Sequence, residues 1–475
     1  MKVRTLHPAA VPFAAVVLAM LPAVLDQTML ATALPVIAGD LGRITDVSWV
    51  VTAYVVAAAA ATPLWGKLGD RLGRKRMLEV ALAGFVAVSA LCGAAQDITQ
   101  LILLRLVQGI AAGGLMALAM ASVGDLVEPR ERGRYQGYIA ATFAVATIIG
   151  PLLGGLLVDE ASWRWVFFVN LPVGAVALAG LRLRLPATGV ERPEHPLDAL
   201  GALLLAGATS TLMLACIQDD GRIPLIAATG VLAAALALRE RRAADPIVPL
   251  RLLRTRTVAL VSTALFLATA SLFAITVFVP LFLQTTTGAT PTEAGLLLVP
   301  AMLGITVSTT VSGRLIARTG RYKRFPIAGL ALMTVALAGL ATLADDPSRT
   351  ATGAGLVVFG LGFGMVTQVL VTAIQNTVER RELGVATATA GFFRALGGAV
   401  GAAVLGAVFA AQAGATAHEG AGLAGVARAD VIDGVQAVFA VAAPLAALAL
   451  VAVLALVEVP LRAAADARAG QRAAA

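Results

Sequence analysis

The chain has 475 residues, of which 59% are hydrophobic and 13% charged, and its formal net charge is +8. A soluble domain carries about 25% charged residues, so the composition excludes an ordinary soluble enzyme and indicates a polytopic membrane protein. The basic residues gather in alternate loops rather than on one face, which argues against nucleic acid as a partner. Cys92 and Cys216 lie in apolar segments and the histidines are scattered, so we expect neither a disulfide framework nor a metal site.

Fourteen segments are long and apolar enough to be membrane-spanning helices, each of which needs about 20 residues. The first begins soon after Lys2 and Arg4, but it is too long for a signal peptide and contains Asp26, so we expect the protein to retain it. The predicted spans are 11–37, 47–65, 77–95, 99–121, 136–158, 163–181, 198–216, 223–239, 258–284, 292–313, 325–343, 351–373, 384–411 and 434–457.

The distribution of Lys and Arg supports this topology. With the N-terminus in the cytoplasm, the inside segments hold 29 of the 36 basic residues and the outside loops hold five. An excess of basic residues in cytoplasmic loops is the usual signature of orientation. We therefore expect a multi-pass protein of the cell (inner or plasma) membrane, surrounded by the lipid bilayer, with both termini in the cytoplasm.

The chain also contains an internal repeat. The stretch that begins at Gly66 is echoed by one that begins at Gly313, an offset of 247 positions, and the same offset relates Gly150 to Gly397. Two repeated bundles that face each other are typical of alternating-access transporters, which bind substrate between them near the membrane midplane. The predicted fold is an all-α bundle of two six-helix halves joined by two linking helices, with boundaries at 1–190, 191–255 and 256–475.

One acid lies in the central part of a predicted span. Asp26 is midway along the first helix, where a charge costs roughly 3 kcal/mol or more. Burial away from water favours the protonated carboxyl, so Asp26 could bind a proton and a substrate in alternation. The alternative is a structural acid that hydroxyls or an arginine satisfy. Arg105, in the fourth helix, is the second buried charge, and it could modulate Asp26, form a packing ion pair or extend to the interface.

Five motifs in chain order resemble one family. They are Leu25–Thr28 followed by Ala33–Pro35, Gly66–Lys75, Arg105–Gly113, Gly150–Gly155 and Trp163–Gly174. In that order they are similar to the first-helix signature, motif A, motif B, motif C and the sixth-helix opening of the fourteen-helix drug:proton antiporters of the major facilitator superfamily. The resemblance covers essentially the whole chain.

The resemblance implies a proton-coupled exporter of small amphipathic compounds such as drugs, antibiotics or secondary metabolites, and not an enzyme. It implies proton coupling through Asp26 and Arg105. We expect the proton gradient in place of any cofactor, protons and a small molecule as partners, and a functional monomer. The chain has no phosphate-binding loop of the ATPase type, so we do not expect ATP to drive transport. The alternatives are an importer or facilitator of a metabolite on the same fold and, more remotely, a membrane sensor.

The stretch from Gly66 is predicted to be a gating loop. Two glycines permit a tight turn, and a carboxylate can accept hydrogen bonds from the open amides at the start of another helix. The resemblance implies that this helix is the thirteenth and that the contact latches the outward-facing state. Basic residues that only hold the loop inside are the alternative. The gating residues are Gly66, Asp70, Arg71, Gly73 and Arg74, and the second copy has Ala317 in place of the acid.

The fifth helix carries Gly150, Pro151, Gly154 and Gly155. They combine a kink with a small-residue face, which indicates tight helix packing, and the resemblance to motif C favours export. Candidate pocket residues are polar and aromatic groups of the apolar spans, and Arg394 could bind an anionic substrate or pair with an acid. Every one of them could equally be an ordinary packing residue. They are Gln27, Gln108, Phe143, Phe278, Gln284, Gln368 and Arg394.

Overall fold

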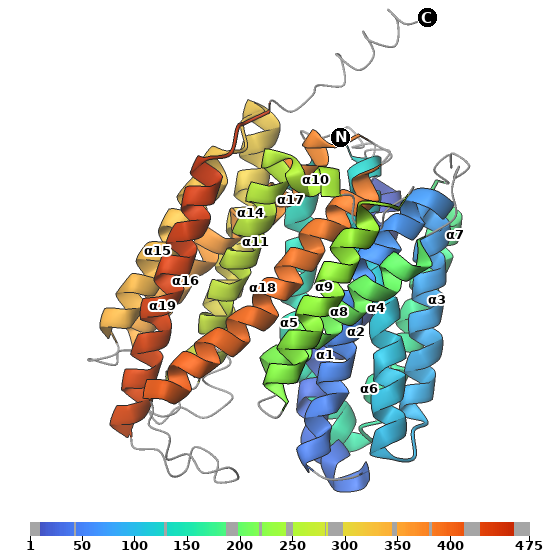
Figure 1. Cartoon of the computed structure of the whole chain (residues 1–475). Helices are drawn as coiled ribbons and strands as arrows, with labels where there is room; N and C mark the ends of the chain where they lie inside the picture. The colour runs from blue at the N-terminus through green and yellow to red at the C-terminus, as the bar shows by residue number, and fades with distance from the viewer. Residues whose placement is uncertain are drawn as a thin grey trace, which may run out of the picture.

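The computed structural model describes residues 10–41, 44–127, 131–186, 198–217, 221–243, 250–280, 282–283, 298–343, 349–379, 382–412 and 428–459. Within these ranges the regular elements are all helices (Figure 1). The first group is α1 (Ala10–Leu41), α2 (Ile44–Leu72), α3 (Arg74–Gly93), α4 (Ile98–Leu126), α5 (Arg132–Glu160), α6 (Trp165–Phe168) and α7 (Asn170–Arg184). The linking elements are α8 (Ala199–Ile217), α9 (Arg222–Glu240) and α10 (Leu250–Arg254). The last group is α11 (Arg256–Phe273), η1 (Ala274–Phe278), α14 (Val299–Thr319), α15 (Arg324–Leu343), α16 (Arg349–Gly364), α17 (Thr367–Thr377), α18 (Leu383–Gln412) and α19 (Arg428–Leu454).

The prediction of fourteen membrane-spanning helices is confirmed, because the described residues form 14 helices long and apolar enough to cross a bilayer. Three of these spans are not single regular helices. The sixth consists of α6 and α7, the ninth continues from α11 into the π-helical turn η1, and the twelfth consists of α16 and α17. Spacing of apolar residues predicts how many helices cross the membrane, but it does not reveal such local breaks.

The loop predicted from Gly66 is almost entirely helical, and the expected two-glycine turn is wrong. α2 continues to Leu72 and α3 begins at Arg74, which leaves Gly73 alone with a φ of 92°. A residue with a side chain rarely adopts that conformation, so only this glycine is required by the turn. Gly66 instead permits close approach of α18, because a Cβ there would lie 2.5 Å from the Cβ of Ala388.

The helices pack as two groups with the same pairings. α1 packs against α5 and α2 against α4 in the first group, as α11 packs against α18 and α14 against α16 in the second. Each group has its own apolar interior, built from α1, α3, α4 and α5 on one side and from α11 and α14–α19 on the other. Across the groups, α2 and α4 contact α18, and α5 contacts α14. α8 of the linking pair contacts both α2 and α18.

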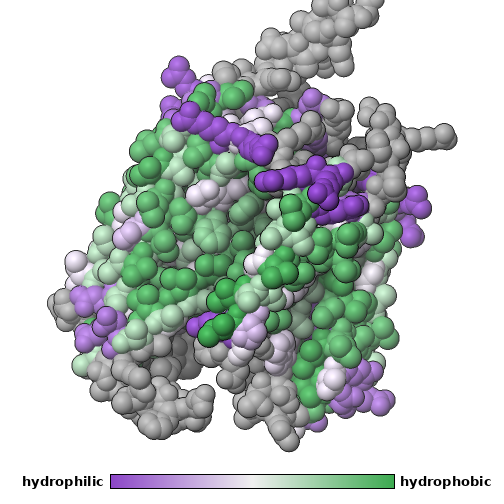
Figure 2. Space-filling model, viewed as in Figure 1, coloured by the Kyte–Doolittle hydropathy of each residue, from purple (hydrophilic) through white to green (hydrophobic). Residues whose placement is uncertain are grey.

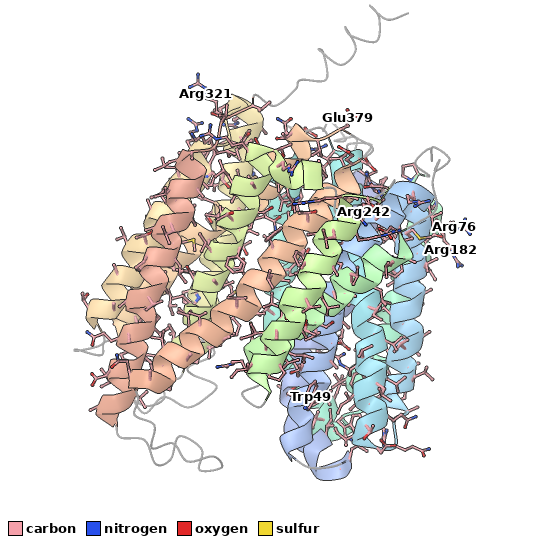
Figure 3. The ribbon with its side chains drawn as sticks, in the orientation of Figure 1. Trp49, Arg76, Arg182, Arg242, Arg321 and Glu379 are labelled. Carbon is pink, nitrogen blue, oxygen red and sulfur yellow. The ribbon has the colours of Figure 1, made fainter. Side chains whose placement is uncertain are left out.

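The two ends of the bundle differ in charge. Figure 3 shows Arg76, Arg182, Arg242 and Arg321 at one end, which we call the basic end, and Trp49 at the other. Between the ends, the surface is a broad hydrophobic belt (Figure 2). α18 starts beside α2 at the basic end and reaches α19 at the opposite end (Figure 1). The two groups therefore meet closely at the basic end and diverge away from it.

Close helix contacts in the first group depend on particular glycines, and Gly154 with its neighbour Gly155 offers a matched test. A Cβ at Gly154 would lie 2.5 Å from Oγ1 of Thr32 and 2.7 Å from the Met29 carbonyl oxygen, whereas one at Gly155 would have no neighbour within 4 Å. We expect Gly154→Val to reduce the free energy of unfolding by about 1–3 kcal/mol through overpacking, and Gly155→Val to change it by about 0.5 kcal/mol or less. Thermal melting of the two purified variants would measure the difference. Equal melting temperatures would contradict this packing.

Candidate functional site

Asp26 and Arg105 form an ion pair in the interior of the first group of helices. Oδ2 of Asp26 lies 2.5 Å from Nη1 of Arg105, and the two side chains are 0% and 1% exposed. Asp26 comes from the middle of α1 and Arg105 from α4, so the pair joins two helices that are far apart in sequence. The sequence left open whether they touch, and the structure shows that they do.

Polar side chains from three helices complete the environment of Asp26. Gln108, one turn after Arg105, donates from Nε2 to Oδ1 of Asp26 at 3.3 Å and accepts from Nη1 of Arg105 at 2.7 Å. Asn170 at the start of α7 donates to the same Oδ1 at 3.4 Å and to Oγ of Ser89 at 3.0 Å. Both carboxylate oxygens of Asp26 therefore have hydrogen-bond donors although no water reaches them.

Arg105 is fixed on its other side by α2. Its Nε donates to the Val50 carbonyl oxygen at 3.2 Å, and its guanidinium carbon lies 4.1 Å from the centre of the Tyr54 ring. A cation over an aromatic face is attracted by the ring, most strongly where water is excluded. Sequence reasoning did not select Tyr54, Ser89 or Asn170 as functional residues. Tyr54 and Ser89 offered only a polar group inside an apolar span, which many packing residues share. Asn170 also lies in the Trp163–Gly174 motif, which could have drawn attention to it.

The electrostatics of the pair constrain what it can do. Removing one partner of a buried ion pair costs about 3–5 kcal/mol, because the other charge is left without compensation. The pair therefore contributes to the packing of α1 against α4, and loss of either charge would weaken that packing.

The fifth-helix motif holds α5 against α1 beside this pair. Gly150 packs on Thr28, and Gly154 packs on Met29 and Thr32, so the contact begins two residues after Asp26. Pro151 is exposed, and a Cβ at Gly155 would have no neighbour within 4 Å. Two of the four motif residues thus form the α1–α5 contact in this structure.

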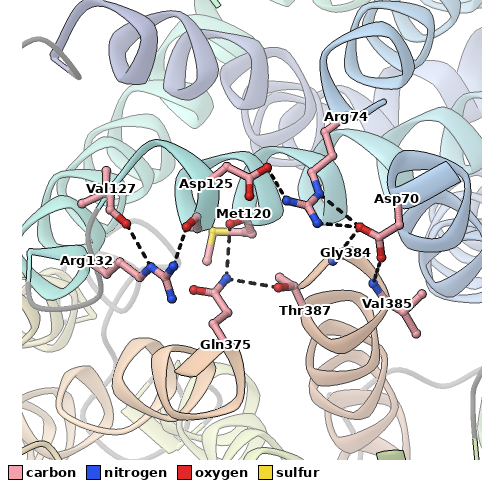
Figure 4. A network of polar contacts seen from close by, with 11 residues as sticks. Asp70, Arg74, Met120, Asp125, Val127, Arg132, Gln375, Gly384, Val385 and Thr387 are labelled. Atoms are coloured by element: carbon pink, nitrogen blue, oxygen red, sulfur yellow. Dashed lines mark hydrogen bonds and ion pairs between the residues drawn. The ribbon is translucent and has the colours of Figure 1, made fainter. Parts of the chain in front are cut away.

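A second polar network joins the two groups at the basic end (Figure 4). Asp70, near the end of α2, accepts hydrogen bonds from the backbone amides of Gly384 at 2.9 Å and Val385 at 2.8 Å, at the start of α18. Arg74 donates to Asp70 from Nη2 at 2.6 Å and also forms an ion pair with Asp125 of α4. A carboxylate at a helix N-terminus satisfies open amides and complements the helix dipole. This places Asp70 where the resemblance implied.

The same network includes contacts that the sequence did not suggest. Gln375 of α17 donates from Nε2 to the Met120 carbonyl oxygen at 3.4 Å and to Oγ1 of Thr387 at 3.1 Å (Figure 4). Arg132, at the start of α5, donates to the carbonyl oxygens of Val127 at 3.2 Å and Gly124 at 2.5 Å. α4, α5, α17 and α18 are thereby connected at the basic end.

The other predicted residues occupy different environments. Arg71 is half-buried at the end of α2, and Gly73 is the buried turn residue. Gln27 and Arg394 are exposed, and Phe143 and Gln368 are half-buried. Gln108 belongs to the Asp26 site, whereas Phe278 packs on Phe409 within the interior of the second group. Gln284 lies outside the described residues.

Residues 16–402 match the sequence profile of the Major Facilitator Superfamily. The chain belongs to this superfamily. An uncharacterized MFS-type transporter of Mycobacterium tuberculosis is 40% identical over 84% of this chain and 59% of its own length, so the chain spans less than two thirds of that relative. The multidrug transporter protein MdtP of Bacillus subtilis is 34% identical over 84% of this chain and 75% of its own, and the efflux pump FUS6 of Gibberella moniliformis is 31% identical over 84% and 73%.

The fold of this superfamily member has solved counterparts. The human organic anion transporter MFSD10 aligns with a TM-score of 0.70 at 19% identity, over 94% of this chain and 100% of that one. At such low identity the likeness concerns the fold alone. The sequence profile and the relatives place the chain in a superfamily of membrane transporters, and the fold agrees with this membership.

A double-mutant cycle would test the Asp26–Arg105 pair. Asp26→Asn and Arg105→Gln should each lower thermal stability because each leaves one buried charge uncompensated. The double variant should be more stable than the sum of the two changes predicts, by about 1–3 kcal/mol. Asp159→Asn, an exposed acid at the end of α5, serves as the control and should have little effect. Additive single effects in melting experiments would argue against the pair.

Asp70→Ala would test the contact between α2 and α18. Loss of helix-capping hydrogen bonds costs about 1–2 kcal/mol, so the population in which the groups separate at the basic end should rise roughly five- to thirtyfold. Arg76 and Arg321 lie in different groups at that end (Figure 3). The distance between spin labels at these two positions would be measured by double electron–electron resonance. Asp97→Ala removes a comparable cap within one group, where Asp97 accepts from Gln100 at 2.8 Å, and should leave the distances unchanged.

Proposed function

We propose that this transporter exports small amphipathic compounds in exchange for protons, and that Asp26 is the group that binds the proton. The observation that carries the proposal is the ion pair of Asp26 with Arg105, sealed inside one group of helices. Export of drug-like compounds is supported by relatives named as a multidrug transporter and an efflux pump, at 34% and 31% identity.

Proton binding at Asp26 would act through charge balance. With Asp26 ionised, the pair is neutral as a whole and the packing of α1 on α4 is favoured. With Asp26 protonated, Arg105 lacks its counter-ion, so an arrangement that gives the guanidinium water or another anion becomes favoured. A proton that binds the two arrangements with different affinity shifts the equilibrium between them. A substrate that favours the opposite arrangement is thereby coupled to the proton.

Two continuous helices connect the Asp26 site with the contacts between the groups. α5 packs on Thr28 through Gly150 and reaches Thr310 of α14 through Gly137, where a Cβ would lie 2.7 Å from the Thr310 hydroxyl. α4 carries Arg105 and, 20 residues or about 30 Å further along, Asp125, which pairs with Arg74 beside Asp70. A displacement of α1 relative to α4 and α5 would therefore reach both contacts between the groups.

The excess of basic residues at one end leads us to place that end in the cytoplasm. The groups meet there, so the arrangement described corresponds to a transporter closed toward the cytoplasm. Asp70 at the start of α18 would stabilise this outward-facing state, and Ala317 in α14 provides no equivalent acid. The latch is thus proposed to act on the α2–α18 side of the molecule only.

Asp26→Asn is the direct test of proton coupling. The amide keeps the size and hydrogen-bonding capacity of the side chain but cannot titrate, so we expect gradient-driven ethidium efflux from cells to be abolished. Exchange of labelled against unlabelled substrate across proteoliposomes, with no net proton movement, should persist. Asp159→Asn is the control and should retain efflux. An Asp26→Asn protein that exports with an unchanged pH dependence would remove Asp26 from the mechanism.

The direction of transport is tested separately, because an importer could use the same fold. Cells that express the protein are loaded with ethidium, and the proton gradient is then collapsed with a protonophore. We expect retention of the dye to rise, since export loses its driving force. If retention of no accumulated compound changes, and uptake of a nutrient falls instead, the protein is an importer.

A further inference from the structure

Arg394 is a charged residue near the middle of a membrane-spanning helix, and it takes no part in the Asp26 site. It lies in α18, eleven residues or about 16 Å along the helix from the start at Leu383. A cation at such depth is costly unless water or an anion reaches it. The surroundings of the Arg394 guanidinium therefore indicate whether water or an anion compensates its charge.

The contacts of α18 show that Arg394 faces the interface between the two groups. Residues separated by three, four or seven positions share one helix face. Gly391, three residues before Arg394, faces Thr62 of α2 in the first group, and Gly398, four residues after it, faces Thr269 of α11 in the second group. A Cβ at either glycine would lie 3.7 Å from the threonine methyl group. Thr387, seven residues before, accepts a hydrogen bond from Gln375, which also contacts the Met120 carbonyl of the first group. The face that carries Arg394 thus points inward.

Arg394 is exposed on this inward face. Its side chain has a large accessible surface, although the neighbouring residues on the same face contact helices of both groups. The side of α18 that faces lipid differs from the side that carries Arg394. Val404, which is exposed, lies about a quarter-turn around the helix from Arg394. Ala395 and Ala399, on a further side, pack toward α2 and α8. The two properties together place the guanidinium on a water-accessible space between the groups.

The described residues provide no acid to pair with Arg394. No carboxylate lies within ion-pair distance of it among them, and the described spans of its own group contain a single acid, Asp433, near the start of α19. The central acid of the other group, Asp26, is already bound to Arg105. Within the middle of the membrane the described side chains therefore carry one uncompensated positive charge, at Arg394.

We infer that Arg394 binds the anionic group of the transported compound, so that the substrates include amphipathic organic anions such as carboxylates and sulfonates. This inference rests on the proposed export function and specifies its substrate class. The planar guanidinium offers paired donors that match the two oxygens of a carboxylate. The apolar helix faces around the site would hold the rest of the molecule, while the anion supplies the missing negative charge.

A matched pair of probes tests charge recognition. 2-Naphthoate and its neutral analogue 2-naphthamide have nearly the same shape, and their affinities are measured by calorimetry on the full-length protein in nanodiscs. We expect the wild type to prefer the naphthoate and Arg394→Gln to bind it about tenfold more weakly, with the amide unchanged. Arg394→Lys keeps the charge and should retain most of the preference. Thr147→Val, at the equivalent position of α5 by the 247-residue offset, is the control.

A wild type that binds the naphthoate no better than the amide overturns the inference, as does an Arg394→Gln protein that loses both probes equally. Transport separates this failure from that of the proposed function. If ethidium efflux depends on the proton gradient while Arg394→Gln leaves naphthoate binding intact, export stands and the anion site does not. If no gradient-driven efflux occurs but the charge preference follows Arg394, the anion site stands and the export proposal does not.

A second measurement needs no substrate. Thr269→Cys, in a background with Cys92→Ala and Cys216→Ala, places one thiol across from Gly398 of the Arg394 face. A positive charge attracts anionic reagents, so a sulfonate-bearing methanethiosulfonate should modify this thiol faster than its ammonium analogue does. Arg394→Gln should lower that rate ratio severalfold. A ratio that is independent of Arg394 would show that its charge does not govern the space between the groups, which overturns the inference.

Discussion

The ion pair of Asp26 with Arg105 is the interaction on which the first group of helices depends. Two opposite charges inside a membrane protein are stable only when helices enclose them and donors satisfy their remaining atoms. α2 supplies the Val50 carbonyl and α7 supplies Asn170, so the pair ties helices from most of this group to one point. The first group is therefore held together around one buried ion pair.

The second group repeats the packing without the charges. Gly150 and Gly154 lie on Thr28 and Thr32, as Gly397 and Gly401 lie on Phe266 and Ala270. In this alignment of the two halves, the residue of the second group that corresponds to Asp26 is Ala264, which is fully buried in the apolar interior. The halves have thus kept a common framework of helix contacts. They differ in where charge is placed: a sealed pair in the first, and a single accessible cation in the second.

The sequence predicted the number of spans and the repeat, and it singled out Asp26, because lipid imposes hydropathy and makes a central acid conspicuous. It named Arg105 and Gln108 but left open whether they contact Asp26, and it did not select Asn170 or Ser89. Asn170 reaches Asp26, and Ser89 reaches Asn170, only through the way the helices pack, which spacing along one chain does not encode. The Gly66 prediction failed for a related reason: α2 extends beyond the apolar stretch, so hydropathy ended the helix too early. Pocket membership could not be predicted either, since Gln27 and Gln108 look alike in sequence but one is exposed and the other buried.

The linking pair makes the two sides of the molecule unequal toward the surrounding lipid. α8 lies across α2 and α18, whereas α5 and α14 meet with neither α8 nor α9 among their main neighbours in the described chain. In the described chain, α8 therefore shields the α2–α18 contact from lipid, whereas neither linking helix shields the α5–α14 contact. A compound dissolved in the bilayer could then enter between the two groups only from the α5–α14 side. Entry from the membrane would depend on which side of the protein faces the compound.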